Sequence, residues 1–375
     1  MNMPPGILRQ AMPLGERPRI LVIVMRRLGD VLLATPLLRT LRNGIPHATI
    51  DVLVFRGTEG ILAGNPDIDA ILTLPQRPGL RATLAMVRDV WRRYDLAIST
   101  QAGDRPTFLA FAAGRSRIGL VPAAGGAWKR RVLDHPVAAD PDSHRVVELL
   151  RLIDCLGIAS RPELVCPTAS PSPSPSPQAG PPLVPGAPSG RYAVLHANPM
   201  FRFRRWTDEG WRALARALGA RGLSVVATGG PEPSERAYLD RIWQSVEPAI
   251  IRLDGRLDWP GLAALLRGAE VYVGPDTSMT HLAAASGCPT VALYGPASPS
   301  LIGPWPIGGL DMPWARAGTI QHRGNVWVVQ NPLPCLPCDK LGSERHLESF
   351  SRCLDELSAP AVLRAVDQAL RRQPA

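Results

Sequence analysis

The sequence predicts an α/β protein made of two doubly wound domains. Strand and helix patterns alternate along the chain, the alternation occurs twice, and a Ser/Pro-rich run separates the two series near the middle of the chain. Alternation of this kind predicts parallel sheets that are covered by helices on both faces. A chain of 375 residues also exceeds what one hydrophobic core usually supports, so two domains are expected.

The N-terminal series starts with a short apolar run of the buried parallel-strand kind, which is followed by a Gly-Asp turn. Strand patterns cover 19–25, 49–55, 70–75 and 95–100, and helix patterns cover 31–43 and 80–94. These elements predict a first domain over 1–165.

Residues 166–190 form a Ser/Pro/Gly-rich spacer that cannot bury a core. The alternation then resumes and predicts a second domain over 191–358, followed by a C-terminal helix over 359–375 that could pack back on the N-terminal domain. Strand patterns in this half cover 192–198, 223–230, 271–273 and 290–295, and helix patterns cover 207–222, 234–245 and 261–270.

Charge and composition restrict the class of protein. The net charge of +10 and a pI near 9.9 favour polyanionic partners such as nucleic acid, anionic lipid or a phosphorylated substrate. Nucleic acid is disfavoured because the chain lacks the interleaved aromatic and basic residues of single-strand binders. No apolar run is long enough to cross a bilayer and no signal peptide is recognisable, so a soluble, intracellular protein is expected. Six cysteines in a chain of this length do not predict a disulfide scaffold.

Ligands of open parallel sheets bind beyond the carboxyl ends of the strands, so the turns at these ends are the candidate site. In "VYVGPDTSMTHLAAASGCPTVALYGP" (271–296) a strand ends at Gly274, and Asp276 falls where the next helix begins. Free N–H groups and the helix dipole at that point suit a phosphate or pyrophosphate. Asp276 could instead be an ordinary helix cap, and His281 could be structural.

The turn in "MRRLGDVLLATP" (25–36) offers a second candidate. Gly29 permits close approach of a ligand to the backbone, and Asp30 stands at the entrance of the following helix. Asp30 could cap this helix or serve as a general base, and its spacing does not decide between them.

Two further turns follow strands of the second half. In "HANPMFRFRRWTDEGW" (196–211) three arginines alternate with aromatic residues, which places fixed cations beside flat apolar surfaces. In "TGGPEPSE" (228–235) Glu232 could accept hydrogen bonds from a ribose or base, or be a surface glutamate.

These turns carry a family resemblance. The stretch "ILVIVMRRLGDVLLATPLLRTLR" with the following "IDVLV", the "RRW" after "LHAN", and "GPDTSMTHLAAASGCPTVALYGPASP" resemble the ADP-heptose:lipopolysaccharide heptosyltransferases of glycosyltransferase family 9. Among the branches, the chain most resembles the one that adds the third core heptose. The resemblance implies the GT-B fold, in which two Rossmann-like domains face each other across the active site, with the acceptor on the N-terminal and the donor on the C-terminal domain.

The resemblance also implies roles for individual residues. Asp30 matches the general base that takes the proton of the acceptor hydroxyl, and Arg204, where lysine is usual, would neutralise the departing diphosphate. Arginine keeps the charge but spreads it over a planar fork. Ser278 stands where glycine is more usual. Donor-binding positions are implied at Gly29, Asn198, Glu232, Leu257, Asp276, Thr277, Ser278 and His281.

The implied activity is an inverting transfer of heptose from ADP-heptose to the lipopolysaccharide inner core, with no cofactor and no catalytic metal. Cytoplasmic residence with peripheral contact to the anionic inner membrane is expected, because basic residues gather in the half that faces the acceptor. These are Arg39, Arg42, Arg115, Arg117, Lys129, Arg130 and Arg131. Two alternatives stay open, a GT-B transferase with another nucleotide-sugar or a protein acceptor, and a non-catalytic nucleotide-sugar-binding protein.

Near the C-terminus, "CLPCDKLGSERHLESFSRCLDEL" (335–357) resembles a tail in which relatives often carry four cysteines. Here there are three. A structural zinc could be ligated by these cysteines and one histidine, although the spacing matches no standard zinc finger. The candidate ligands are Cys335, Cys338, His346 and Cys353.

Overall fold

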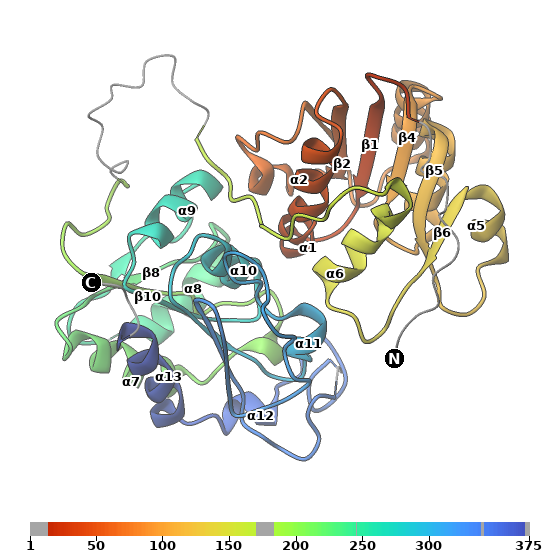
Figure 1. The fold of residues 1–375 in the computed structure, drawn as a ribbon. Helices are drawn as coiled ribbons and strands as arrows, with labels where there is room; N and C mark the ends of the chain where they lie inside the picture. The colour runs from red at the N-terminus through yellow and green to blue at the C-terminus, as the bar shows by residue number, and fades with distance from the viewer. Residues whose placement is uncertain (1–13, 170–183, 245, 339–340, 372–375) are drawn as a thin grey trace.

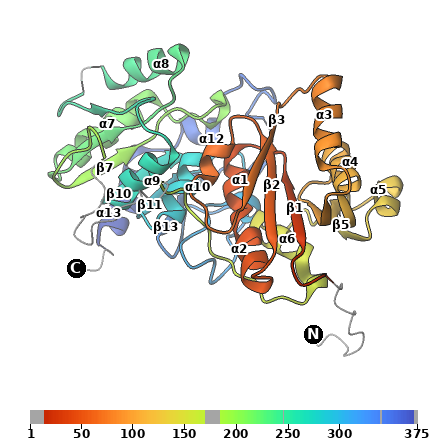
Figure 2. The same ribbon diagram turned by 90° about the horizontal axis from the view of Figure 1, so that it is seen from above.

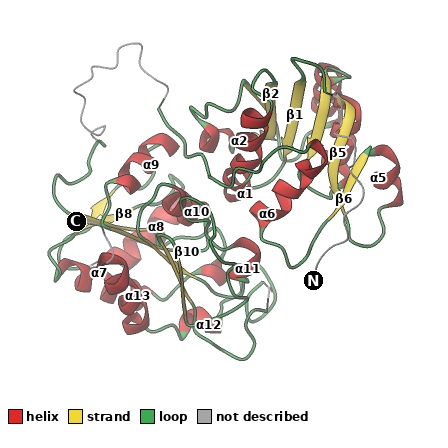
Figure 3. Ribbon diagram, in the orientation of Figure 1, coloured by secondary structure: helices red, strands yellow, loops and turns green. Residues whose placement is uncertain are grey.

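The chain forms two parallel sheets, each flanked by helices (Figures 1 and 3). The computed structural model describes residues 14–169, 184–244, 246–338 and 341–371. Residues 170–183, the centre of the expected spacer, and the last residues of the expected C-terminal helix lie outside this part. Within it, no helix is long and apolar enough to cross a membrane.

The first sheet has the strand order β3-β2-β1-β4-β5-β6, and all of its described strands run parallel. Its strands are β1 (Arg19–Val24), β2 (Thr49–Phe55), β3 (Ala70–Leu74), β4 (Tyr94–Ser99), β5 (Gly114–Val121) and β6 (His135–Ala138). The helices of this half are α1 (Leu28–Leu33), α2 (Thr35–Gly44), α3 (Leu80–Val90), α4 (Asp104–Ala113), α5 (Ala127–Val132) and α6 (Arg145–Leu150), with 3₁₀ turns η1 (Glu59–Leu62) and η2 (Arg151–Leu156).

The second sheet has the order β12-β13-β11-β10-β7-β8-β9, and only β12 is antiparallel to its neighbour among the described strands. Its strands are β7 (Tyr192–Leu195), β8 (Ser224–Ala227), β9 (Ile251–Arg252), β10 (Val271–Pro275), β11 (Thr290–Leu293), β12 (Ile320–Arg323) and β13 (Val326–Val329). The helices are α7 (Asp208–Gly219), α8 (Pro233–Trp243), α9 (Trp259–Arg267), α10 (Ser278–Ala285), α11 (Pro299–Ile302), α12 (Arg352–Asp355) and α13 (Ala359–Arg371), with the 3₁₀ turn η3 (Arg202–Arg204).

The expected helix over 31–43 is divided into two helices. α1 ends at Leu33 and α2 begins at Thr35, with Pro36 in the first turn of α2. Proline lacks the N–H that would bond the carbonyl four residues back, and its ring crowds that carbonyl, so a helix tends to restart there. α1 is therefore a short helix, and Gly29 and Asp30, which the sequence suggested as a turn before the helix, lie in its first turn.

The two halves pack against each other through α1 and α10. One apolar cluster includes Val31 and Leu32 of α1 together with Met279 and Leu282 of α10. Polar contacts add to this boundary, because His144 Nε2 lies 2.9 Å from the carbonyl oxygen of Gly303. Burying apolar side chains from both halves in one cluster favours a fixed relative position of the two sheets.

The C-terminal helix α13 packs on the second sheet. It contacts α7, β11 and β13, and it buries a stripe with helical spacing made by Ala361, Val362, Ala365, Val366 and Ala369. The expectation that this helix could pack back on the N-terminal domain is therefore wrong. The stripe fits the C-terminal core, which is rich in large side chains such as Trp211 and Trp327 that the small alanines accommodate.

Candidate active site

The first turn of α1, which follows β1, and the first turn of α10, which follows β10, meet where the two halves pack together. A Cβ atom placed on Gly29 would lie 3.2 Å from Cδ2 of His281 and 3.7 Å from the Cα of Ser278. Both turns lie at the carboxyl ends of central strands, as ligand sites of parallel sheets do. The structure therefore brings Asp30 and the tip of α10 together, although 246 positions separate Asp30 from Asp276 in the sequence.

Asp30 lies in the first turn of α1, and no side chain caps this helix. Its carboxylate is held between two guanidinium groups, since Oδ1 lies 3.8 Å from Nε of Arg26 and 3.8 Å from Nε of Arg145. The side chain is only 13% exposed. The capping alternative left open by the sequence does not describe this residue, whose oxygen faces cations of two different elements.

Arg145 was not singled out from the sequence. It starts α6 and is buried, with Nη1 donating to Glu148 Oε2 at 2.6 Å and Nη2 donating to the carbonyl oxygen of Thr100 at 2.8 Å. These bonds fix the guanidinium beside Asp30. The only sequence signal was indirect, because the residue follows a strand at the same edge of the sheet as Asp30.

Asp276 is buried at the end of β10 and is surrounded by three polar side chains. Arg204 Nη1 lies 3.0 Å from its Oδ2 and also donates to its carbonyl oxygen at 2.8 Å. The Tyr294 hydroxyl donates to Oδ1 at 3.5 Å, and His281 Nε2 lies 3.9 Å from the same oxygen. The residue at the N-cap of α10 is Thr277, so Asp276 is not the helix cap.

The tip of α10 carries no side-chain cap among the described residues, and Thr277 and Ser278 are partly exposed. The N–H groups of a first helical turn have no partner within the helix, and they share the positive end of the helix dipole. This end of α10 is therefore suited to an anionic group that approaches beside Asp30.

His281 is buried between the two halves. Burial lowers its pKa, Asp276 and Asp30 act in the opposite direction, and Arg204 lowers it further. The neutral imidazole leaves Nδ1 buried without a hydrogen-bond partner among the described residues. The electrostatic effect of both aspartates on this ring places all three groups in one site.

Several buried polar atoms of this region make no hydrogen bond within the described part of the chain. They are Arg145 Nε, Asn198 Oδ1, Arg204 Nε, His281 Nδ1 and Asp276 Oδ2, the last of which has only the ion pair with Arg204. Buried polar groups are normally paired, so a group of unpaired ones needs a reason. Groups that a ligand satisfies on binding are one such reason.

The remaining predicted residues lie along the second sheet. Glu232 is exposed at the start of α8 and does not cap it. Glu235 instead turns back, and its Oε1 accepts from the Gly230 N–H at 2.8 Å. Leu257 is partly buried beside Trp259 in the apolar cluster that both halves share. The inward-facing acid of this turn is thus Glu235, which the sequence did not distinguish from its neighbour.

The arginines of the loop after β7 diverge. Arg204 faces Asp276, whereas the guanidinium of Arg205 stacks on the Tyr238 ring at 4.0 Å and Nη1 of Arg202 donates to the carbonyl oxygen of Glu348 at 3.3 Å. Only Arg204 of the three therefore reaches the candidate site.

The C-terminal cysteines are not gathered with a histidine. Burial raises the pKa of the Cys353 thiol to about 12, and the thiols of Cys338 and Cys335 act in the same direction. His346 Nε2 lies 3.1 Å from Glu344 Oε2 instead. Among the described residues, which omit 339 and 340, no three potential ligands are placed to hold a metal ion.

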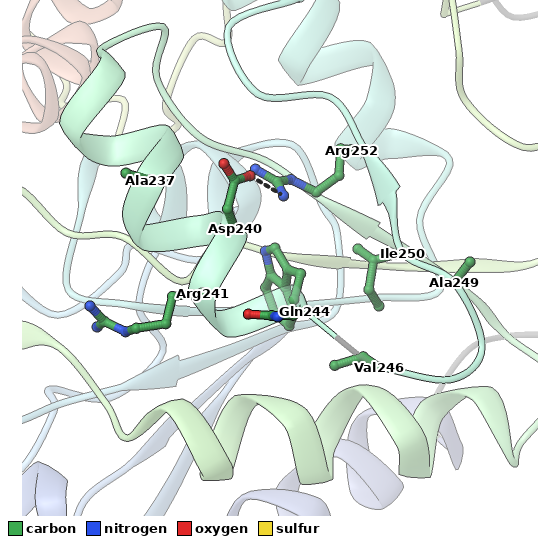
Figure 4. A pocket seen from close by; sticks show the side chains of 9 residues that line it. Ala237, Asp240, Arg241, Gln244, Val246, Ala249, Ile250 and Arg252 are labelled. Carbon is green, nitrogen blue, oxygen red and sulfur yellow. Dashed lines mark hydrogen bonds and ion pairs between the residues drawn. The ribbon is translucent and has the colours of Figure 1, made fainter.

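Two cavities of about 610 and 620 Å³ lie away from these residues. The first lies between α8 and β9, where Asp240 and Arg252 form an ion pair at 3.0 Å (Figure 4). The second lies at the β6 edge of the first sheet, beside η2. Neither is lined by a residue that the sequence predicted for the site. The site is therefore defined by its strand-end turns and polar groups.

Comparisons with known proteins identify the family of the chain. A family model described as glycosyltransferase family 9 (heptosyltransferase) matches residues 84–308. Lipopolysaccharide heptosyltransferase 3 of Escherichia coli is 30% identical over 291 residues, which cover 75% of this chain and 84% of that protein. Lipopolysaccharide heptosyltransferase 1 of Pseudomonas aeruginosa is 27% identical over 345 residues, with 86% of each chain covered.

Solved structures show the same fold. The glycosyl transferase family 9 protein of Veillonella parvula superposes with a TM-score of 0.74 at 19% identity, covering 97% of this chain and 99% of that one. The E. coli heptosyltransferase WaaC, solved with ADP, gives 0.68 at 19% identity, covering 94% and 99%. The fold is thus GT-B, two facing Rossmann-like domains, as predicted. The chain belongs to glycosyltransferase family 9, and it is a glycosyl-transferring enzyme.

Proposed function

We propose that the protein transfers a heptose from ADP-L-glycero-D-manno-heptose to the inner core of lipopolysaccharide by an inverting displacement. The donor lies on the C-terminal half and the acceptor on the N-terminal half. Family membership and the lipopolysaccharide heptosyltransferases among the relatives support the reaction class. An ADP-bound relative of the same fold supports an adenine diphosphate donor.

The observation that carries the proposal is the meeting of Gly29 and Asp30 with the tip of α10. A displacement needs a base and a stabilised leaving group on opposite sides of one reacting carbon, within a few ångströms of each other. Here a carboxylate from one half faces an anion-suited helix end from the other. The unpaired Nε of Arg204 is a further donor beside that helix end.

In the proposed step, the acceptor hydroxyl oxygen attacks the anomeric carbon and Asp30 takes its proton. The bond from that carbon to the diphosphate oxygen breaks, and ADP leaves with the electron pair. Arg204 and the first turn of α10, from Thr277 and Ser278, stabilise the charge on ADP. Because this charge grows during the reaction, such contacts lower the barrier rather than only tightening donor binding.

The other donor contacts are assigned by position. Asn198 follows β7, whereas Glu232 and Leu257 stand beyond the ends of β8 and β9, where a nucleoside would extend from the diphosphate. Asp276 acts by holding Arg204 and His281 in place. A lipid-linked acceptor also implies that the enzyme works in the cytoplasm, in peripheral contact with the inner membrane.

The test is incubation with ADP-heptose and a panel of truncated core acceptors, with the product identified by its mass. Wild-type protein should extend one acceptor by a single heptose. Asp30→Asn should lower kcat by roughly 10²- to 10⁴-fold, the usual contribution of a general base, while ADP affinity stays within about threefold.

Asp104→Asn is the matched control, because Asp104 also lies in the first turn of a helix after a parallel strand but is 80% exposed. It should keep kcat within about twofold. Near-normal turnover by Asp30→Asn would show that Asp30 is not the general base. If the wild type transferred heptose to none of the core acceptors, the proposed substrate would be wrong.

A further inference from the structure

The outer face of α3 is apolar although nothing in the described structure covers it. Leu80 is 84% exposed and Leu84 is 66% exposed, and their four-residue spacing puts them on one side of the helix. Trp91, just after the helix, is 55% exposed. The opposite side of α3 already packs on the first sheet through Val87 and Val90. The exposed residues are therefore not needed for the core of this domain.

The neighbouring helices also expose large apolar side chains. α3 packs on α4 and α4 packs on α5, on the side of the first sheet turned away from α1, α2 and α6 (Figure 2). Phe108 of α4 is 45% exposed and Trp128 of α5 is 43% exposed. The α3–α5 face is defined here by Leu80, Leu84, Trp91, Phe108 and Trp128 with the arginines around them. A soluble surface rarely gathers exposed apolar side chains of this size without a partner.

The same segment carries most of the excess positive charge. Between Arg77 and Arg131 there are eleven Lys or Arg residues and three Asp or Glu residues, in a chain whose net charge is +10. Exposed arginines of this segment are Arg77, Arg81, Arg88, Arg92, Arg93, Arg105, Arg115, Arg130 and Arg131. An apolar patch inside a basic rim is complementary to a surface with acyl chains below and phosphates above.

Other basic residues of the N-terminal half contribute less to such a surface. Arg39 and Arg42 lie on α2, on the other side of the sheet, and form ion pairs at 2.6 Å with Asp67 and Asp69. Lys129 is buried, and its Nζ lies 2.9 Å from Asp104 Oδ1. Arg17, Arg26, Arg27, Arg56 and Arg161 are also exposed in this half, but they are fewer than the exposed arginines of the segment from Arg77 to Arg131.

One end of the α3–α5 face lies toward the sheet edge that carries Asp30, which gives a partner of this face access to the site. α3 follows the carboxyl end of β3 and α4 follows that of β4, and these strands run parallel to β1. The N-terminal ends of both helices therefore lie at the same edge of the sheet as Asp30. Leu80 and Arg81 stand at the end of the face that is nearest to this edge.

We infer that the α3–α5 face docks the enzyme on an anionic phospholipid bilayer. Leu80, Leu84 and Trp91 enter the boundary between headgroups and acyl chains, and the surrounding guanidinium groups bind lipid phosphates. This inference rests on the proposed function for its purpose, because a lipid-linked acceptor would then reach the acceptor side of the site. The docking itself requires no donor and no acceptor.

The test measures binding of the full-length protein to vesicles of phosphatidylglycerol and phosphatidylethanolamine, without lipopolysaccharide. Wild-type protein should co-sediment with these vesicles at low salt, and less so at high salt or with phosphatidylcholine alone. The double variant Leu80→Ser/Leu84→Ser should bind at least about tenfold more weakly. Arg81→Gln/Arg88→Gln should weaken binding and flatten its salt dependence.

The matched control is Ile307→Ser/Met312→Ser, which removes two exposed apolar side chains of the other half, 63% and 56% exposed. It should bind vesicles as the wild type does. Both apolar double variants should retain wild-type transfer to a lipid-free core acceptor, which separates loss of docking from misfolding. Equal vesicle binding by Leu80→Ser/Leu84→Ser and wild type would overturn the inference. A dimer in sedimentation velocity that this variant dissociates would overturn it too, by assigning the face to a second copy.

Discussion

Arg204 reaches from the loop after β7 to Asp276 at the end of β10, and its Nη1 contacts both the carbonyl oxygen, at 2.8 Å, and the carboxylate, at 3.0 Å. One guanidinium thus joins two strand ends of the second sheet. The same side chain has a buried Nε that makes no hydrogen bond with the described residues. Arg204 is therefore held in place at one end of its fork and has a donor left for a ligand.

Two substitutions of Arg204 should distinguish the effect of its charge on kcat from the effect of its planar shape. Arg204→Gln removes the cation and should lower kcat by roughly 10²- to 10³-fold, as loss of a transition-state donor does in other enzymes. Arg204→Lys keeps the cation but cannot contact Asp276 and a diphosphate with the same planar fork, so an intermediate loss is expected. Steady-state kcat and KM for the donor measure both variants.

The control is the neighbouring Arg205, which stacks on Tyr238 and does not reach Asp276. Arg205→Gln should leave kcat within about threefold of the wild type. Equal losses at the two positions would show that the loop depends on its total charge and not on the Arg204 contact.

Gly29→Ala should lower turnover without lowering stability. Gly29 lies in the first turn of α1, where alanine has a higher helix propensity than glycine, by at most about 1 kcal/mol. The new Cβ would lie 3.2 Å from the His281 ring, however, so the two turns must move apart by a few tenths of an ångström. We expect kcat to fall by roughly tenfold without a lower thermal midpoint. Activity assays and calorimetry on the same sample test this.

Gly79→Ala provides the comparison, since nothing lies within 4 Å of the Cβ it would add. It should leave turnover unchanged. If Gly29→Ala were as active as Gly79→Ala, close approach of α1 and α10 would not matter for the reaction.

The fold was predictable because its buried strands correspond to short apolar runs in the sequence. Runs such as 19–25 and 49–55 coincide with β1 and β2, and both sheets have the expected parallel character. The division at Ala34 was missed because apolar spacing continues across it while Pro36 restarts the helix. Periodicity reports which side chains are buried and does not report how the backbone turns between them.

The site was predictable only as far as it sits on strand-end turns. Asp30 and Asp276 come together as the turn positions indicated. Arg145 and Glu235 were missed for a common reason, because their roles come from burial and from partners far along the chain or across a turn. Nothing local distinguishes a buried arginine from the many exposed ones of this basic sequence.

The buried pair of Arg145 and Glu148 yields a prediction that separates stability from catalysis. Their side chains are 10% and 12% exposed and their charged atoms lie 2.6 Å apart. Arg145→Met leaves Glu148 buried and unpaired, so the free energy of unfolding should fall by about 3–5 kcal/mol. Arg145→Met/Glu148→Met removes both charges and should recover most of this loss, as measured by urea unfolding.

Turnover should not recover with stability in the double variant. Arg145 Nε lies 3.8 Å from Asp30 Oδ1, and methionine cannot replace this contact. We expect kcat to stay at least about tenfold below the wild type. Full recovery of both properties would limit Arg145 to a structural role.

His144 should make the boundary between the two halves sensitive to acid. Its Nδ1 accepts from the Val146 N–H at 3.2 Å and its Nε2–H donates to the carbonyl oxygen of Gly303 at 2.9 Å, so the neutral ring satisfies both partners. Burial lowers the pKa of His144 from 6.5 to about 4. A proton on Nδ1 would face the Val146 N–H and break the cap of α6.

The sign of the effect follows from this shift. Between pH 6.5 and about 4 the unfolded chain binds a proton at His144 and the folded chain does not. The contribution of the neutral ring to the free energy of unfolding is therefore fully present above pH 6.5 and decreases as the pH falls toward 4. A shift of this size corresponds to roughly 3 kcal/mol. His144→Asn keeps a capping side chain without a titrating ring. Between pH 7 and pH 4, the free energy of unfolding should therefore decrease by roughly 3 kcal/mol less in His144→Asn than in the wild type. Urea unfolding across this range tests the difference, with exposed His47→Asn as the control. An equal acid dependence of His144→Asn and wild type would exclude this ring as the acid-sensitive contact.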